Sequence, residues 1–208
     1  MLDGEQIGDE VRVIGFSRRV VANLLDGLLI VFATFLVIMG LSFLGIFVGM
    51  YRPEEEPPAA AIALISALVV SFVYYCGAWA STGQTLGHFM IGGRVTRLDG
   101  GKLSWGQAIV RYIGFIISGL ALSLGFLWIV FDKKRQGWHD KLARTVVPFV
   151  DDEFPEGKPA EFTPADPGGG KGWIVVWLVL LLVAPAALLG SLAVLGPAIW
   201  RVVANFFR

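Results

Sequence analysis

Apolar residues in this chain gather in long runs separated by short polar segments. The first run covers residues 20–50 and the second covers 59–79. A helix needs about 20 apolar residues to cross the hydrocarbon layer of a membrane, so each run is long enough to span it. Three prolines at positions 53, 57 and 58 separate the two runs and end the first helix. The pattern therefore predicts two full membrane-spanning helices in this part of the chain.

Two further apolar runs follow, and they are less regular. The run 104–131 is interrupted by Arg111 and by glycines at positions 114, 119 and 125. Its length suffices for one span but not for two. It therefore either crosses the membrane once or forms a re-entrant or in-plane hairpin that breaks near Gly119–Gly125. The last run, 172–208, predicts a C-terminal membrane helix with an amphipathic end.

The positions of lysine and arginine favour the hairpin. Cytoplasmic loops of membrane proteins carry an excess of these residues. With the N-terminus in the cytoplasm, a crossing at 104–131 leaves eight of them on each side, whereas a hairpin leaves fourteen inside and three outside. We therefore expect a protein of the plasma (inner) membrane with a cytoplasmic N-terminus. The direction of the last helix stays open, because Arg201 and Arg208 would fall outside.

The polar segments predict a small β element and a linker. Residues 94–103 are typical of a short strand, an Asp-Gly-Gly turn and a returning strand, and 145–150 are strand-like. In the hairpin topology 94–97 and 145–147 lie on the cytoplasmic side, where they can pair. Residues 151–171 contain four prolines, three consecutive glycines and six acidic residues, a composition typical of a disordered linker. The predicted fold is an all-α polytopic membrane protein with a core at 1–150, a linker at 151–171 and a C-terminal helix at 172–208.

Composition agrees with membrane residence and excludes some function classes. The chain is 55% apolar and 16% charged, whereas a soluble domain is about 25% charged. Its 17 basic and 17 acidic residues balance, which gives no reason to expect nucleic-acid binding. The single cysteine, Cys76, cannot form an intramolecular disulfide. No HExxH, GxSxG or CxxC motif occurs, so we expect neither an enzyme nor a cofactor.

Three stretches resemble the RDD family of membrane proteins, which is named for one arginine and two aspartates. They are 18–26 (RRVVANLLD), 83–95 (GQTLGHFMIGGRV) and 131–147 (FDKKRQGWHDKLARTVV). By position, Arg19 and Asp26 match the family's arginine and first aspartate, and Asp140 matches the second. The resemblance implies little about activity: transport is suspected, cation/proton exchange has been proposed for some members, and relatives occur in larger membrane assemblies.

Asp26 is the leading candidate for a functional group. A carboxylate within a membrane segment costs roughly 2.5–3.5 kcal/mol, so it is normally retained for a partner or a pathway. In one interpretation, Arg19 or Arg111 neutralises Asp26 and Asp140 and holds the hairpin against the first helix. In the other, Asp26 binds a proton or a cation on a transport path. Asn23 lies between Arg19 and Asp26 in sequence, where it can bridge them.

Three further groups of residues have weaker interpretations. The small residues Gly45, Gly49, Ala59, Ala63, Ala67 and Ser71 form stripes that permit close helix packing, although glycine and alanine are common in such helices. The basic residues Lys133, Lys134 and Arg135 are expected to attract anionic lipid headgroups. His88 and His139 lack a metal-ligand spacing, so no metal site is expected.

Two functions remain open. The first is transport of a small solute, or of cations in exchange for protons, by an oligomer in the lipid bilayer, since so few helices leave little room for a path within one chain. The second is a non-catalytic accessory or scaffold subunit that docks on other membrane proteins, in which the charged residues are purely structural.

Overall fold

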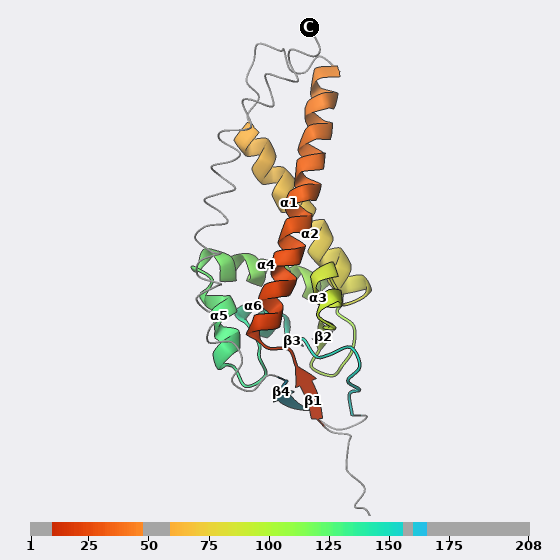
Figure 1. Cartoon of the computed structure of the whole chain (residues 1–208), viewed down its shortest axis with the longest axis vertical. Coiled ribbons are helices and arrows are strands. Elements are labelled where there is room, and N and C mark those ends of the chain that lie inside the picture. Colours follow the sequence, from red (N-terminus) through yellow and green to blue (C-terminus); the bar gives the residue numbers. More distant parts are fainter. Residues whose placement is uncertain (1–9, 48–58, 156–159, 166–208) are drawn as a thin grey trace, which may run out of the picture. The chain divides into compact units, whose positions relative to one another are not determined.

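The computed structural model describes residues 10–47, 59–155 and 160–165. These residues form six helices and four short strands (Figure 1). They divide into two units at Gly27–Leu28 and again at Ser71–Phe72. The charged residues of interest all belong to the unit that contains 10–27 and 72–165. The predicted C-terminal helix, 172–208, lies outside the described residues.

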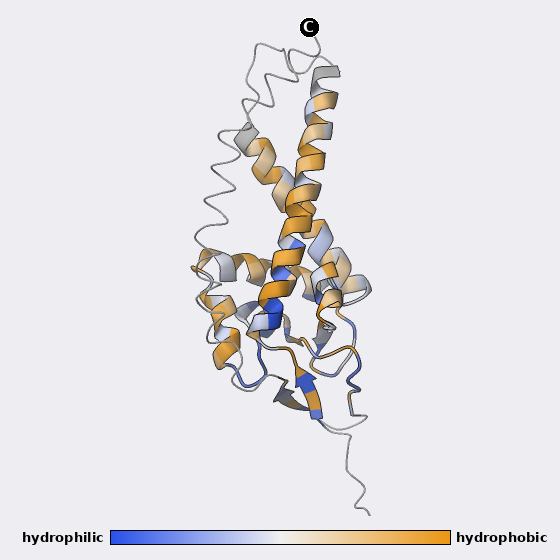
Figure 2. Cartoon of the chain, viewed as in Figure 1, coloured by the Kyte–Doolittle hydropathy of each residue, from blue (hydrophilic) through white to orange (hydrophobic). Residues whose placement is uncertain are grey.

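The two predicted spanning helices are present. Helix α1 comprises Phe16–Phe47 and α2 comprises Ala59–Ser81, and both are long and apolar enough to cross a membrane. Apolar side chains on both helices are widely exposed, with Leu28 at 69% and Leu64 at 62%. Such exposure is unfavourable in water and is expected where lipid covers the helix. Hydrophilic residues are concentrated in the first turns of α1, and hydrophobic residues follow along the rest of the helix (Figure 2).

The third apolar run forms two helices instead of one. Helix α4 comprises Trp105–Leu120 and α5 comprises Leu124–Phe131, and the two are bent by 101°. Leu122 and Ser123 lie between these helices. Their φ angles are 52° and 58°, which a continuous helix does not permit. The predicted break near Gly119–Gly125 is therefore confirmed.

Two short helices were not predicted. Helix α3 comprises Leu86–Met90 and α6 comprises Trp138–Ala143. Five or six residues are too few to show a helical period of hydrophobicity. The only local cue for α3 is Thr85, whose side chain accepts a hydrogen bond from the His88 backbone N–H and caps the helix.

The small β element pairs the two segments that the sequence indicated. Strand β2 (Thr96–Arg97) is antiparallel to β3 (Thr145–Val146). The predicted return strand at 101–103 does not form. The Arg97 N–H instead bonds to the Gly101 carbonyl oxygen at 2.9 Å and closes the turn without extending a hairpin ladder.

A second sheet was not predicted. Strand β1 (Glu10–Val13) is parallel to β4 (Glu161–Pro164). Strand β4 lies within 151–171, so the prediction of a disordered linker does not hold for these four residues. Nearby contacts explain the order: Arg12 binds the Asp152 carboxylate, and Phe154 packs edge-on against Phe162. Composition alone does not reveal such contacts.

The contact between α4 and α6 depends on a glycine. A Cβ atom at Gly114 would lie 2.9 Å from the His139 Cα and 3.0 Å from the Leu142 Cδ1. A Cβ at Gly119, on the same helix, would meet nothing within 4 Å.

Gly114→Ala should therefore lower the free energy of unfolding by about 1–3 kcal/mol, because α4 and α6 must move apart. Gly119→Ala is the matched control and should be neutral or stabilising, since alanine favours a helix by about 1 kcal/mol over glycine. Thermal unfolding in detergent compares the two variants. Equal effects would show that α4 and α6 are not in close contact.

Candidate functional site

A buried ion triad joins three helices. Arg19 on α1 donates from Nη1 to Asp140 Oδ2 of α6 at 2.6 Å. Arg111 on α4 donates to the other oxygen, Asp140 Oδ1. The three residues are between 0% and 4% exposed. A carboxylate clamped between two guanidinium groups in low dielectric is a strong interaction, and it leaves the triad with one net positive charge.

Neighbouring groups hold the arginines of the triad in place. Arg19 also donates from Nε to the Ile14 carbonyl oxygen at 3.1 Å and from Nη2 to the Arg135 carbonyl oxygen at 2.8 Å. The guanidinium of Arg111 donates to Thr145 Oγ1 and lies 4.8 Å from the centre of the Trp79 ring. A planar guanidinium on an aromatic face gains cation–π energy. The triad thus ties the N-terminal segment to the segment that follows α5.

The carboxylate of Asp140 is stabilised in its charged form. Burial alone would raise its pKa, but Arg111 and Arg19 outweigh burial and hold the pKa well below its ordinary value. The Gly137 backbone N–H adds a hydrogen bond of 2.8 Å to Oδ2. His139 lies beside this carboxylate, with 3.5 Å between Nε2 and Oδ2. Burial and the two arginines lower the pKa of His139 to about 3, so the ring is neutral at pH 7 and forms no ion pair.

Asp26 lies apart from the triad, and its hydrogen-bond donors among the described residues are neutral. Its Oδ1 accepts hydrogen bonds from the Tyr74 hydroxyl and the Gly87 backbone N–H, each at 2.7 Å. Its Oδ2 accepts one from the Thr85 hydroxyl at 2.7 Å. The side chain is fully buried, and no ion pair reaches it from the described residues. Three good donors satisfy the carboxylate without neutralising it.

Close approach of α3 to α1 makes this arrangement possible. A Cβ atom at Gly87 would overlap the Ala22 carbonyl oxygen and lie 2.8 Å from the Ala22 Cα. Only glycine lets its backbone N–H reach a carboxylate one helical turn further along α1. Tyr74 helps to fix α3 as well, because its hydroxyl oxygen accepts the Leu86 N–H at 2.9 Å.

His88 is buried near both groups. Its Nδ1 lies 2.7 Å from Thr85 Oγ1, which places the imidazole one hydroxyl away from Asp26. Burial, Arg111 and Arg19 lower the pKa of His88 to about 3. The ring is therefore neutral at pH 7, and one of its two nitrogens carries the proton.

The structure divides the predicted charged set. Arg19 and Arg111 both bind Asp140, whereas the interpretation had one of them neutralise Asp26 as well as Asp140. Arg19 does not neutralise Asp26, because its side chain turns toward Ile14 and Asp140 instead of along α1. Asn23 is half-buried and does not bridge Arg19 to Asp26 by any hydrogen bond between the described residues.

The basic residues and the small residues singled out in the sequence lie in different surroundings. Lys133 and Lys134 are exposed, whereas Arg135 is half-buried and donates to the Val130 carbonyl oxygen at 2.5 Å. Arg135 therefore shapes its loop, and lipid binding by the two lysines stays a prediction. Gly45 is buried, and Ala63, Ala67 and Ser71 are half-buried. Gly49 and the side chain of Ala59 lie outside the described part of the chain, so the packing stripe as a whole stays a prediction.

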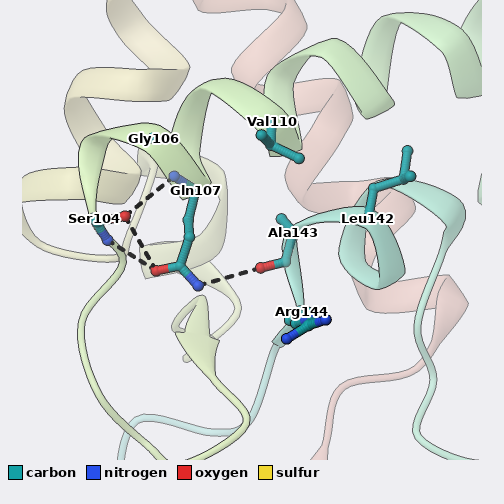
Figure 3. Close-up of a pocket in the computed structure, with 7 residues that line it drawn as sticks. All are labelled: Ser104, Gly106, Gln107, Val110, Leu142, Ala143 and Arg144. Atoms are coloured by element: carbon teal, nitrogen blue, oxygen red, sulfur yellow. Dashed lines mark hydrogen bonds between the residues drawn. The ribbon is translucent and has the colours of Figure 1, made fainter.

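Neither a metal centre nor a deep pocket coincides with these residues. Within 10–47, 59–155 and 160–165, no three His, Cys, Asp or Glu side chains are grouped to hold a metal ion. A hollow of about 330 Å³ lies between the start of α4 and the end of α6 (Figure 3). Its polar groups bind one another: Gln107 bonds to Ser104 and to the Ala143 carbonyl oxygen. No residue of the ion triad or of the Asp26 site lines it.

Sequence reasoning missed the partners of Asp26. Tyr74 is hidden in an apolar run, Thr85 and Gly87 belong to the stretch 83–95 without a predicted role, and for His88 the sequence raises only the question of metal binding. The spacing of Thr85, Gly87 and His88 is informative. The motif contains a helix-capping threonine at position i, a glycine at i+2 and a histidine at i+3. It therefore places a hydroxyl, a backbone N–H without a side chain beside it, and an imidazole at one helix end.

Two helices of membrane-spanning length with exposed apolar side chains define this chain as a membrane protein. Residues 13–144 match the RDD family model, and the chain belongs to the RDD family. It is similar to the uncharacterized protein YxaI of Bacillus subtilis (strain 168), with 30% identity over 144 residues that cover 64% of this chain and 95% of YxaI. No solved structure matches the chain.

Removal of the shared carboxylate should destabilise the protein strongly. In Asp140→Asn the two buried arginines lose their counter-charge, which should lower the free energy of unfolding by about 3–5 kcal/mol. Asp99→Asn is the control, because Asp99 forms an exposed pair with Arg97 and its loss should change stability little. Thermal unfolding in detergent measures both. A small effect of Asp140→Asn would show that the triad does not hold the helices together.

Stability should also fall as the pH is lowered from 7 toward 4. The histidines bind protons near pH 6.5 in the unfolded chain but only near pH 3 in the folded one, so the unfolded state binds more protons between these values. Each histidine should contribute a slope of about 1 kcal/mol per pH unit. Asp140 adds a further loss below pH 4. Unfolding midpoints at several pH values test this, and His139→Phe should reduce the slope. A flat profile would contradict the burial of neutral histidines.

Proposed function

We propose that this RDD-family protein transports a small solute, or cations in exchange for protons, and that Asp26 is the group that binds the proton or cation. One observation carries the proposal. Asp26 is fully buried in a membrane-length helix, and its partners among the described residues are all neutral donors. A carboxylate kept for structure alone is normally paired with a cation.

The neighbouring ion triad strengthens this argument. Two buried arginines, Arg19 and Arg111, lie in the same unit, and both bind Asp140. Cationic side chains are therefore present in this unit, but none of those described pairs with Asp26. Its charge is then free to be neutralised by an arriving proton or metal cation, which is the property that a transport site requires.

The hairpin topology supports a cytoplasmic site. Strand β2, a few residues before α4, pairs with β3, which follows α5 and α6. If α4 and α5 together crossed the bilayer, these strands would be separated by about 30 Å of hydrocarbon. We propose that α4 and α5 form an in-plane or re-entrant hairpin, with the N-terminus and the strands in the cytoplasm and the protein in the plasma membrane.

The two faces of α4 agree with an in-plane position. Its buried face contains Ala108, Arg111, Tyr112, Gly114 and Ser118. Its exposed face is apolar, with Trp105, Ile109, Val110, Ile113, Ile117 and Leu120. A helix with one strongly apolar exposed face is typical of segments that lie in the membrane interface.

A transport path would require more than one copy of the chain. The described residues contain two helices of spanning length, and two or three helices per chain cannot enclose a path. We therefore propose a homo-oligomer.

The second candidate function is an accessory or scaffold subunit without catalytic activity. The observation that favours it is the pairing of Asp140 with both Arg19 and Arg111, which is a structural use of charge. In this case the protein would act through a fixed association with other membrane proteins.

Proton flux in reconstituted vesicles tests the first function. With a pH-sensitive dye inside and a gradient of Na⁺, K⁺ or Li⁺, the wild type should move protons, and Asp26→Asn should lose at least tenfold in rate. Asp99→Asn, in an exposed turn, is the control and should keep full activity. Monodisperse elution must confirm that each variant is folded.

Absence of flux in the wild type with every cation would contradict transport. A constant heteromeric partner that copurifies after mild detergent extraction would then favour the accessory subunit. A homo-oligomer with flux that depends on Asp26 would favour transport.

A further inference from the structure

The hydroxyl of Thr85 lies between two ionisable groups. Its Oγ1 is 2.7 Å from Asp26 Oδ2 and 2.7 Å from His88 Nδ1. It also accepts a hydrogen bond from the His88 backbone N–H at 3.1 Å. Asp26, Thr85 and His88 are 0%, 1% and 4% exposed, so water does not readily replace these contacts.

A hydroxyl has one proton to donate and two lone pairs to accept with. One lone pair of Thr85 Oγ1 is taken by the His88 backbone N–H, which always donates. One donor and one acceptor position therefore remain for two partners, Asp26 and His88. If Thr85 donates to Asp26, it must accept from His88 Nδ1. If it donates to His88 Nδ1, it must accept from Asp26.

The other contacts of Asp26 set the direction of its carboxyl group. Oδ1 accepts from the Gly87 N–H, which can only donate, and from the Tyr74 hydroxyl. A proton on Asp26 therefore belongs on Oδ2, the oxygen that faces Thr85. Each protonation state of Asp26 thus has one bonding pattern that satisfies Asp26, Thr85 Oγ1 and His88 Nδ1.

We propose that Thr85 couples the charge of Asp26 to the tautomer of His88 and serves as a proton relay between them. When Asp26 is ionised, Thr85 donates to it and His88 carries its proton on Nδ1. When Asp26 is protonated, it donates to Thr85, Thr85 donates to Nδ1, and His88 carries its proton on Nε2. As a route for protons the relay rests on the proposed transport function, whereas the coupling itself does not.

The proton transfer balances without another reactant. A proton binds His88 at Nε2 while the Nδ1 proton moves to Thr85 Oγ1 and the original Thr85 proton moves to Asp26 Oδ2. One proton has entered, Asp26 is neutral, and His88 is again a neutral ring with its proton on Nε2. The reverse sequence releases the proton from Nε2.

The charged neighbours of His88 disfavour a stable imidazolium and so favour transfer of its proton to Thr85. Arg19 on α1, Arg111 on α4, and His139 and Asp140 on α6 all act on His88, and the arginines help lower its pKa to about 3. Near Asp26 the titratable neighbours are Tyr74 and Tyr75 of α2. A histidine that cannot keep a second proton passes it on, which suits a relay.

Asp26→Asn provides a sharp test, because asparagine imitates protonated Asp26. The Gly87 N–H requires the amide oxygen at the Oδ1 position, so the NH₂ group must face Thr85 and donate to it. Thr85 must then donate to His88 Nδ1. In ¹⁵N-histidine NMR of the full chain in detergent, His88 Nδ1 should change from a protonated to an unprotonated nitrogen between the wild type with ionised Asp26 and Asp26→Asn.

The chain supplies its own internal control. It contains two histidines, and the signals of His139 should stay unchanged. Infrared detection of the protonated carboxyl band, by difference against Asp26→Asn, reports the charge of Asp26 in the wild type. Thr85→Val should abolish the coupling, and Thr85→Ser, which keeps the hydroxyl, should retain it.

The wild type alone also tests the coupling. As pH is varied, the tautomer of His88 should change together with the carboxyl band of Asp26. An Nε2 tautomer beside an ionised Asp26, or the same tautomer in wild type and Asp26→Asn, would overturn the proposal. Coupling without ion-driven flux would refute transport and leave the relay intact, whereas flux that depends on Asp26 without coupling would refute only the relay.

Discussion

The two ion pairs of Asp140 with its arginines determine how helices α1, α4 and α6 of this protein are assembled. Arg19 reaches it from α1, Arg111 from α4, and Asp140 itself lies on α6. Because the pieces come from distant parts of the sequence, a single carboxylate brings three helices to one point. The β2–β3 pairing and the bend between α4 and α5 both lie close in sequence to these residues. Loss of this carboxylate would leave two like charges buried together.

The triad also explains why Asp26 stands apart. Both arginines bind Asp140, and in the described part of the chain the partners of Asp26 are the dipoles of a tyrosine, a threonine and a backbone amide. His88 is near both groups, because its Nδ1 lies 2.7 Å from the Thr85 hydroxyl that binds Asp26 and both arginines lower its pKa. One unit of the fold thus contains a carboxylate that binds two arginines, Asp140, and a carboxylate whose described partners are neutral, Asp26. The transport role that we propose for Asp26 rests on this difference.

Much of this arrangement followed from the sequence, and the parts that did not have a common reason. Long apolar runs predict α1 and α2, and the interrupted run predicts the break between α4 and α5, because these features extend over many residues. The choice of Asp140 rather than Asp26 as the partner of Arg19 depends on tertiary proximity that spacing within one helix cannot show. The same holds for β4, where the contact of Phe162 with Phe154 outweighs a linker-like composition.

The order in which the chain is made gives the triad a consequence for biogenesis. Arg19 and Asp140 are 121 residues apart, so at about 5–20 residues per second the arginine emerges from the ribosome roughly 6–24 s before its partner. The donors of Asp26 follow it by 48 to 61 residues. During that interval the first helix carries unmatched charges of both signs. The first turns of this helix must therefore remain in the headgroup region, or be shielded by the insertion machinery, until the rest of the chain has been synthesised.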